Sequence, residues 1–263
     1  MLTFANVVWG ARCGESARRV LLGETRSRGY AYSVRLRRES ALEREAPHGL
    51  PSSRLVSTIL LDEWFAEQVQ PRLRGTSTLV RYCDDFVMLF ACKDDAERVH
   101  AVLGKRLAKF GLELHPDKTR LIDFRPPAER AGAETMLPTT FVFLGFLHVW
   151  GKSRKGNATM WQRTAKDRLA RTLKAINGQC RLMRPWPLAE QHRRICRMLK
   201  GHFAYFGISG NYQRLTAVVY QTRRLWRKWL SRRSWKSQVT WEQFLRLVKR
   251  YPLPAPRIVH RYT

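Results

Sequence analysis

The chain has 263 residues, 44% hydrophobic and 27% charged, a composition that allows a folded core and excludes a disordered polar tail or a disulfide-stapled miniprotein. Lys and Arg number 49 against 21 Asp and Glu, and this net charge of +28 predicts a polyanionic partner, most simply nucleic acid. No apolar run is long enough to predict a membrane span. The five scattered cysteines favour a reducing cytoplasm over a disulfide framework. A ribosomal or chromatin-like packing protein is the simplest alternative.

Residues 1–57 show no regular pattern. Arginines are mixed with Ser and Gly, and apolar periodicity is poor. The stretch contains Glu but no Asp. We therefore assign it no domain and expect either partial disorder or an out-of-frame N-terminal segment.

Residues 58–150 alternate between helical and strand-like patterns, which predicts an α+β unit. The expected elements, in chain order, are a helix over 58–69, a hairpin over 78–90, a helix over 94–110, extended chain over 112–124 and a strand pair over 140–150 around Gly145. The helix over 58–69 should present Leu61, Trp64 and Val69 on one face, and Pro71 should end it.

The most informative feature of this unit is the sequence Tyr82-Cys83-Asp84-Asp85 between the two hairpin strands. Adjacent carboxylates disfavour each other's ionisation, so a rigid turn that holds both of them favours a bound cation. Mg²⁺ prefers carboxylates completed by substrate phosphates, and such a site can activate a hydroxyl for in-line displacement of pyrophosphate. An ordinary exposed turn, in which Asp is common, explains the same residues, and this motif is too short to decide alone.

Residues 151–263 carry 27 basic and 3 acidic side chains, against 22 and 18 in residues 1–150. About +24 of the net charge therefore lies in this second part, which begins with a Gly/Ser/Lys/Arg loop over 151–156. Its apolar periodicity predicts helices over 163–176, 188–206 with a break at Gly201, 211–230 with Asn211 as the N-cap, and 241–248.

Basic side chains interleaved with aromatic rings predict a nucleic-acid surface, since Arg pairs with phosphate and aromatic rings stack on bases. The candidate RNA-binding residues are Lys152, Arg154, Lys155, Arg163, Lys166, Arg171, Lys174, Arg223, Arg224, Arg227, Lys228, Arg232 and Arg233. A merely solvated basic face is the alternative, but the scarcity of acids favours nucleic acid. Trp226 and Trp229 fall on the apolar face and are expected in the core.

Several stretches, in one order along residues 58–263, resemble group II intron-encoded reverse transcriptases with a maturase region. The resembling segments are the helix 61–65, the palm hairpin 79–90, the G-L-x-L-x-x-x-K-T segment at 111–120, the F-L-G-F turn at 143–146, and the thumb and maturase stretches 150–156, 201–207 and 256–262. The order of these segments makes the resemblance far more specific than the four-residue turn.

The resemblance implies part of a polymerase palm, an antiparallel sheet with helices, over 58–150, followed by an all-α thumb and maturase domain over 151–263. It implies RNA-directed DNA synthesis on an RNA template from a DNA primer, Mg²⁺ as cofactor, and binding of group II intron RNA. The matched positions are Asp84 and Asp85 as catalytic metal ligands, Tyr82 and Lys118 near primer or nucleotide, and Leu144 and Gly145 in the primer-positioning turn.

The palm of that family also carries a metal-binding Asp on an earlier strand, upstream of a P-Q-G segment. This chain has no Asp before Asp62 and no P-Q-G, and Asp62 matches the helix before the hairpin. Two adjacent carboxylates do not enclose two metals, so we expect a truncated enzyme or one that needs a complementing N-terminal half. The rival hypotheses are an inactive module that binds intron RNA in splicing and a degenerate, unfolded product.

Overall fold

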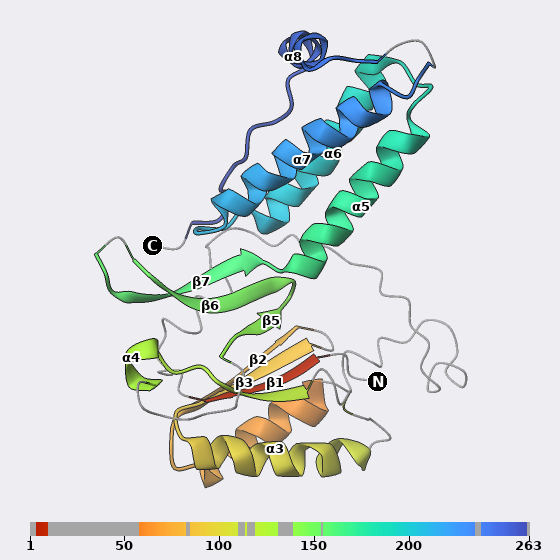
Figure 1. Ribbon diagram of the computed structural model, residues 1–263. Coiled ribbons are helices and arrows are strands. Elements are labelled where there is room, and N and C mark those ends of the chain that lie inside the picture. The colour runs from red at the N-terminus through yellow and green to blue at the C-terminus, as the bar shows by residue number, and fades with distance from the viewer. Residues whose placement is uncertain are drawn as a thin grey trace. The chain divides into compact units, whose positions relative to one another are not determined.

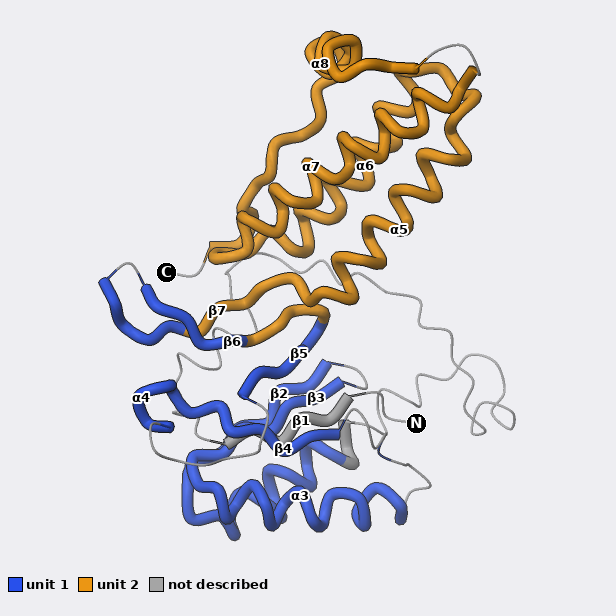
Figure 2. Tube along the Cα trace, in the orientation of Figure 1, with its two compact units in different colours: residues 1–144, 149–159 blue, residues 145–148, 160–263 orange. Residues whose placement is uncertain are grey.

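The computed structural model describes residues 4–9, 58–82, 85–109, 114, 119–130, 139–153, 155–234 and 238–261, and for 4–9 and 58–60 it describes the backbone alone. The chain forms two compact units (Figure 2). The first unit comprises residues 1–144 and 149–159, and the second comprises 145–148 and 160–263. The division between the units passes through two strands, at residues 146–152 and 158–164. The domain boundary that the sequence predicted, at 150–151, lies within the first of these strands.

In the first unit, the helices over 58–69 and 93–108 pack on one face of a small sheet (Figure 1). Its elements are β1 (Phe4–Trp9), the π-helix η2 (Thr58–Val69), the 3₁₀ turn η3 (Gln70–Arg72), β2 (Ser77–Tyr82), β3 (Asp85–Phe90), α3 (Lys93–Ala108), β4 (Thr119–Asp123), α4 (Pro127–Arg130) and β5 (Phe141–Phe143). The predicted α+β class is confirmed. The strand β1 falls in the stretch to which the sequence pattern assigned no element.

The core of this unit forms where the helices meet β3. Leu61, Trp64 and Val69 of η2 are buried, as their spacing predicts, and they pack with Phe86, Met88 and Phe90 of β3. The inner face of α3 completes the cluster with Ala96, Val99, Leu103 and Leu107. Each of these elements buries an apolar stripe that has no other cover, and this shared burial holds the hairpin rigidly.

The sheet has the order β2-β3-β1-β4. The β2–β3 pair is antiparallel, as a hairpin requires, whereas β1 runs parallel to both β3 and β4. The sheet is therefore mixed rather than wholly antiparallel. The physical reason is that β1 enters the sheet between two strands that are distant in sequence, a position that local periodicity does not specify.

A second sheet has the order β5-β6-β7, with β6 at Phe146–Lys152 and β7 at Ala158–Thr164. The strand pair expected around Gly145 is thus present. The prediction of a helix from Arg163 was wrong at its start, because this residue lies in β7. Thr, Met and Trp favour an extended chain over 159–161, and pairing with β6 carries the strand on to Thr164.

Among the described residues, the helices of the second unit are α5 (Lys166–Leu182), α6 (Leu188–Phe206), α7 (Tyr212–Leu230) and α8 (Trp241–Arg250) (Figure 1). The expected break at Gly201 is absent, and α6 runs straight through it. Trp226 is fully buried at the centre of the core, and Trp229 is packed against its edge, as predicted. Within the residues described, no helix is both long and apolar enough to cross a membrane.

Asn211 stands at the N-cap position of α7, as predicted, but its side chain has a different role. Its Oδ1 accepts from the Thr164 backbone N–H at 3.0 Å, and its Nδ2 donates to Thr164 Oγ1 and to the Phe206 carbonyl, each at 2.8 Å. No side-chain bond to the helix N-terminus is formed. The amide therefore joins the end of β7 to the C-terminal end of α6, and it is fully buried there.

Candidate functional site

The turn end of the β2–β3 hairpin brings a phenol and a carboxylate together. Tyr82, the last residue of β2, lies directly opposite Asp85, the first residue of β3. Directly opposed side chains on one sheet face lie about 4.5–5.5 Å apart at Cβ. Tyr82 is 50% exposed and Asp85 is half-buried, so both groups reach the surface. Asp84, the other predicted ligand, lies outside the described residues, as do Lys118 and Arg154.

The hairpin is fixed to the preceding helix by an ion pair. Arg81 of β2 donates from Nε to Asp62 Oδ1 at 3.0 Å and from Nη2 to Asp62 Oδ2 at 2.9 Å. This two-point geometry matches a guanidinium to a carboxylate, and the Arg81 side chain is only 14% exposed. Asp62 therefore holds the hairpin in position.

The strand beside Asp85 carries no carboxylate. β1 pairs with β3 in a register that sets Phe4 opposite Asp85, and its sequence is Phe-Ala-Asn-Val-Val-Trp. At the other end of β1, Trp9 lies opposite Asp123 of β4. Six parallel residues span roughly 16 Å, so Asp123 lies at the far end of the sheet from Asp85. The sheet neighbours of the hairpin thus add no acid to its tip.

Asp123 is committed to a structural partner. Arg125 donates to it from Nε at 3.1 Å, from Nη2 at 2.9 Å and from its backbone N–H at 3.1 Å. Burial alone would raise the pKa of the Asp123 carboxyl, but these hydrogen bonds and the positive charge of Arg125 outweigh burial, and the pKa is lowered. This carboxylate stays ionised as part of the end of β4.

The turn between β5 and β6 has an uncommon backbone. Leu144 has φ of 50° and Gly145 has φ of +80°, the left-handed pair typical of a tight two-residue hairpin turn. The Gly145 carbonyl accepts from the Ala165 N–H at 3.0 Å, and a Cβ on Gly145 would meet Arg168 Cγ at 3.2 Å. Both the backbone angle and the contact with Arg168 therefore favour glycine here.

The reverse transcriptase (RNA-dependent DNA polymerase) family model matches residues 12–148, which is just over half of the chain. The chain belongs to the reverse transcriptase family. The match includes the hairpin with Tyr82 and Asp85 and the turn at Leu144 and Gly145. It begins at residue 12, whereas the resembling motifs begin only after residue 57. No curated protein matches the chain.

Polymerases of the reverse transcriptase family generally act with divalent metal ions. Within the described residues, no three His, Cys, Asp or Glu side chains gather as a metal-binding group, and Asp84 is outside that set. Asp85 at the hairpin tip, with Asp84 next to it in sequence, offers the carboxylate chemistry that suits one Mg²⁺ completed by substrate phosphates. A second metal would need a carboxylate from elsewhere.

The predicted RNA-binding side chains of this reverse transcriptase divide into two groups. Arg227 and Arg233 are occupied structurally, because Arg227 donates to the Val239 carbonyl at 2.9 Å and covers the Trp241 ring, and Arg233 donates to the Trp186 carbonyl at 2.8 Å. Others with a protein contact are Arg163 over Trp161, Arg171 beside Asp167, Arg224 over Tyr220, and Lys228 and Arg232 over Trp229. These contacts orient side chains that still carry their charge.

The second group is exposed and points to solvent. Lys152 and Lys155 lie in the β6–β7 hairpin, Lys166 and Lys174 lie on α5, and Arg223 lies on α7. Within the described part of the chain, none of these five forms an ion pair or a ring contact. They are the residues of the predicted set most available to phosphate.

Proposed function

We propose that this chain acts in RNA-directed DNA synthesis as a reverse transcriptase of the group II intron type. In this proposal Asp84 and Asp85 hold Mg²⁺, Tyr82 lies beside the primer or incoming nucleotide, and Lys118 and the Leu144–Gly145 turn position the primer end. The observation that supports it most is the opposition of Tyr82 and Asp85 at the exposed end of a hairpin whose stem is buried. A rigid stem keeps such a site in place without substrate.

Mg²⁺ at this turn would supply charge stabilisation for the pyrophosphate leaving group and a lowered pKa for the primer 3′-hydroxyl. The protein's own contribution is positional. The Arg81–Asp62 pair and the core around Phe86 fix the hairpin, and Tyr82 offers a half-exposed ring against which a nucleotide can stack.

We further propose that the basic second part binds group II intron RNA in the cytoplasm and so acts as a maturase. The exposed cations of α5, α7 and the β6–β7 hairpin support this, together with the scarcity of acids after residue 150. Cys92, Cys180 and Cys196 are free thiols, which fits a reducing compartment. Binding of this kind should weaken steeply with salt through release of phosphate counterions.

A second candidate is an RNA-binding module that does not polymerise. It is favoured by the absence of a carboxylate on β1, the strand beside Asp85, and by the absence of any Asp before Asp62 in this chain. In that case synthesis would require a complementing segment that carries the further carboxylate.

The deciding experiment is primer extension on an RNA template with a DNA primer, deoxynucleotides and Mg²⁺. The wild type should extend the primer, and Asp84→Ala and Asp85→Ala should each lower extension by at least about a hundredfold, because a metal ligand is removed. Asp94→Ala is the matched control, since Asp94 is an exposed carboxylate at the start of α3, which follows the opposite end of β3 from the hairpin tip. It should extend like the wild type.

Absence of extension by the wild type, with RNA binding intact, would reject the polymerase proposal for this chain alone and leave the binding module. Extension restored by adding a separate palm fragment that carries the missing Asp strand would then show that the chain works as one half of a split enzyme. If the wild type neither extends nor binds RNA, both candidates fail.

A further inference from the structure

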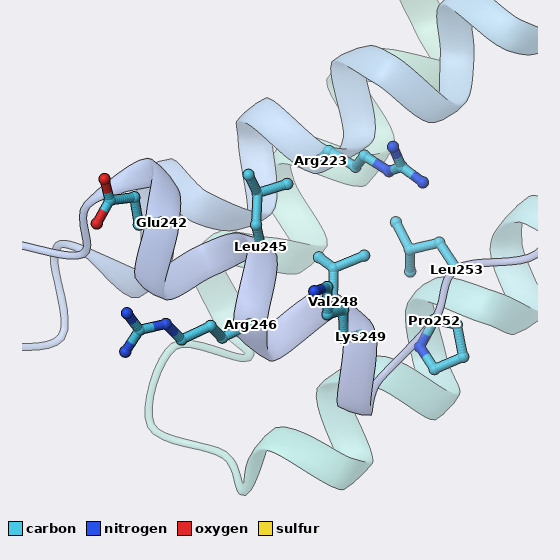
Figure 3. A pocket seen from close by; sticks show the side chains of 8 residues that line it. All are labelled: Arg223, Glu242, Leu245, Arg246, Val248, Lys249, Pro252 and Leu253. Carbon is cyan, nitrogen blue, oxygen red and sulfur yellow. The ribbon is translucent and has the colours of Figure 1, made fainter.

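A groove in the second unit lies between α7 and α8 (Figure 3). Its volume is about 600 Å³, within the range of pockets that take small ligands. Leu245 and Val248 of α8 and Leu253 of the following chain form an apolar floor, and Arg223 of α7 lies at the rim above them (Figure 3). Arg246 and Lys249 of α8 complete the basic lining.

The groove is held in shape from both ends of α8. Thr240 and Gln243 form a reciprocal capping box at its start, with bonds of 3.0 and 3.3 Å. After its last turn, the Pro252 carbonyl accepts from His192 Nε2 at 2.8 Å. Phe244 is fully buried against Trp226, so its neighbour Leu245 is turned outward. These contacts fix both ends of α8, and the bond from His192 also fixes Pro252, which is one of the lining residues.

The outward face of α8 carries an exposed apolar side chain. Leu245 is 54% exposed, although burial of a leucine side chain is favourable by about 1.5–3 kcal/mol. Val248 beside it is half-buried. Leu253, only 8% exposed, and Val248 belong to the edge of the core, so Leu245 is the part of the floor that is open to solvent. An exposed apolar side chain between basic residues offers a surface for binding.

The charge of the lining selects an anion. The lining contains three positive side chains, Arg223, Arg246 and Lys249, and one acid, Glu242. Within the described residues, none of these four forms an ion pair. In Figure 3 the Glu242 carboxylate points away from the apolar floor. A net positive rim around an apolar floor matches a ligand with a flat apolar face and attached negative charge.

We propose that this groove binds one unstacked nucleotide of single-stranded RNA, with the base on Leu245, Val248 and Leu253 and the flanking phosphates on Arg223, Arg246 and Lys249. A base within a duplex has both faces covered by its neighbours, so only a single strand, loop or bulge can present it. The inference rests on the proposed RNA binding and adds a specific subsite, with Leu245, Arg246 and Lys249 as residues outside the set predicted from the sequence.

The test compares the full chain on two labelled probes, each of about twelve nucleotides, by fluorescence anisotropy: a single-stranded RNA and an oligonucleotide of the same length and phosphate count without bases. Leu245→Ser should lower affinity for the RNA about tenfold and leave the abasic probe unchanged, since the apolar contact that covers one base is removed. Leu182→Ser is the matched control, because Leu182 on α5 is also an exposed leucine, at 67%. It should bind both probes like the wild type.

The phosphate contacts are tested by the triple variant R223Q/R246Q/K249Q against the charge-matched control R181Q/R197Q/K200Q, whose three residues are exposed on α5 and α6. The groove variant should lower affinity for both probes and reduce the slope of log affinity against log salt by about 2, roughly 0.7 for each single-strand phosphate that the variant no longer neutralises. Circular dichroism of each variant checks that the helices remain folded.

Equal binding of RNA by Leu245→Ser and the wild type, or equal decreases in affinity for the two triple variants, would overturn the groove proposal while wild-type RNA binding remains. Equally strong competition by a poly-glutamate peptide would assign the groove to an acidic protein segment and would also overturn it. A wild type that binds neither probe would reject the proposed RNA-binding function itself, so the two failures are distinguishable.

Discussion

Arg81 and Asp62 join the β2–β3 hairpin to the helix that precedes it through two hydrogen bonds of 3.0 and 2.9 Å. The residues are 19 positions apart, one on β2 and one on η2. The pair fixes the end of the strand that terminates in Tyr82, the residue next to Arg81. The geometry of the candidate site therefore depends on a contact outside it.

A double-mutant cycle should measure this pair. Asp62 is 40% exposed, so solvent screening limits the coupling between Arg81→Gln and Asp62→Asn to about 1 kcal/mol of unfolding free energy. Urea denaturation of the four proteins gives the value. The exposed pair Lys93–Glu97, at 3.4 Å within α3, is the control and should show no more than about 0.5 kcal/mol. Equal coupling in the two cycles would contradict the positioning role.

The centre of the second unit should be sensitive to a conservative change at Trp226. Its Nε1 donates to Gln191 Oε1 at 2.9 Å, and both side chains are buried. Trp226→Phe should cost about 2–3 kcal/mol, because it leaves a cavity and an unpaired amide oxygen. Trp241→Phe is the control at a ring that is 44% exposed, with an expected cost below about 1 kcal/mol. Chemical denaturation followed by circular dichroism distinguishes them, and comparable costs would count against a central role for Trp226.

Two glycine substitutions should act in opposite directions. Gly145→Ala places a side chain at φ of +80° and against Arg168, so it should destabilise the protein by about 1–2 kcal/mol. Gly178 lies within α5, and a Cβ added there would meet open space. Gly178→Ala should therefore stabilise the protein by about 0.5–1 kcal/mol. Thermal melts of the two variants check the signs, and a stabilised Gly145→Ala would show that the turn does not require its left-handed backbone.

Stability should fall in mild acid because of His202. Burial lowers the pKa of this imidazole from 6.5 to about 4, and its Nε2 has no hydrogen-bond partner among the described residues. The unfolded chain therefore binds a proton at a pH where the folded chain does not. The stability that the neutral His202 contributes to the folded chain is fully present above pH 6.5 and is lost as the pH falls toward 4.

The decrease in stability should reach at most about 3 kcal/mol across that window. Urea denaturation of the wild type and of His202→Leu at a series of pH values measures it. The variant should show a flatter pH dependence than the wild type between these limits. Identical curves for the two proteins would rule out His202 as the titrating group.

Local periodicity was sufficient to predict the hairpin, the apolar face of η2, and the core position of Trp226. In each case the periodic pattern of apolar residues close together in sequence determines which face of the element is buried. The uneven distribution of charge also follows from the sequence alone, because it needs only a count along the chain.

Only the tertiary structure decided which residues meet. It set β1 parallel to β3 with no acid opposite Asp85, placed Arg163 in a strand, and turned the Asn211 amide toward Thr164. It also assigned Arg227 to a structural contact and placed Leu245 in an open groove. Strand register and side-chain partners depend on segments far apart in sequence, whose pairing leaves no periodic trace in either segment.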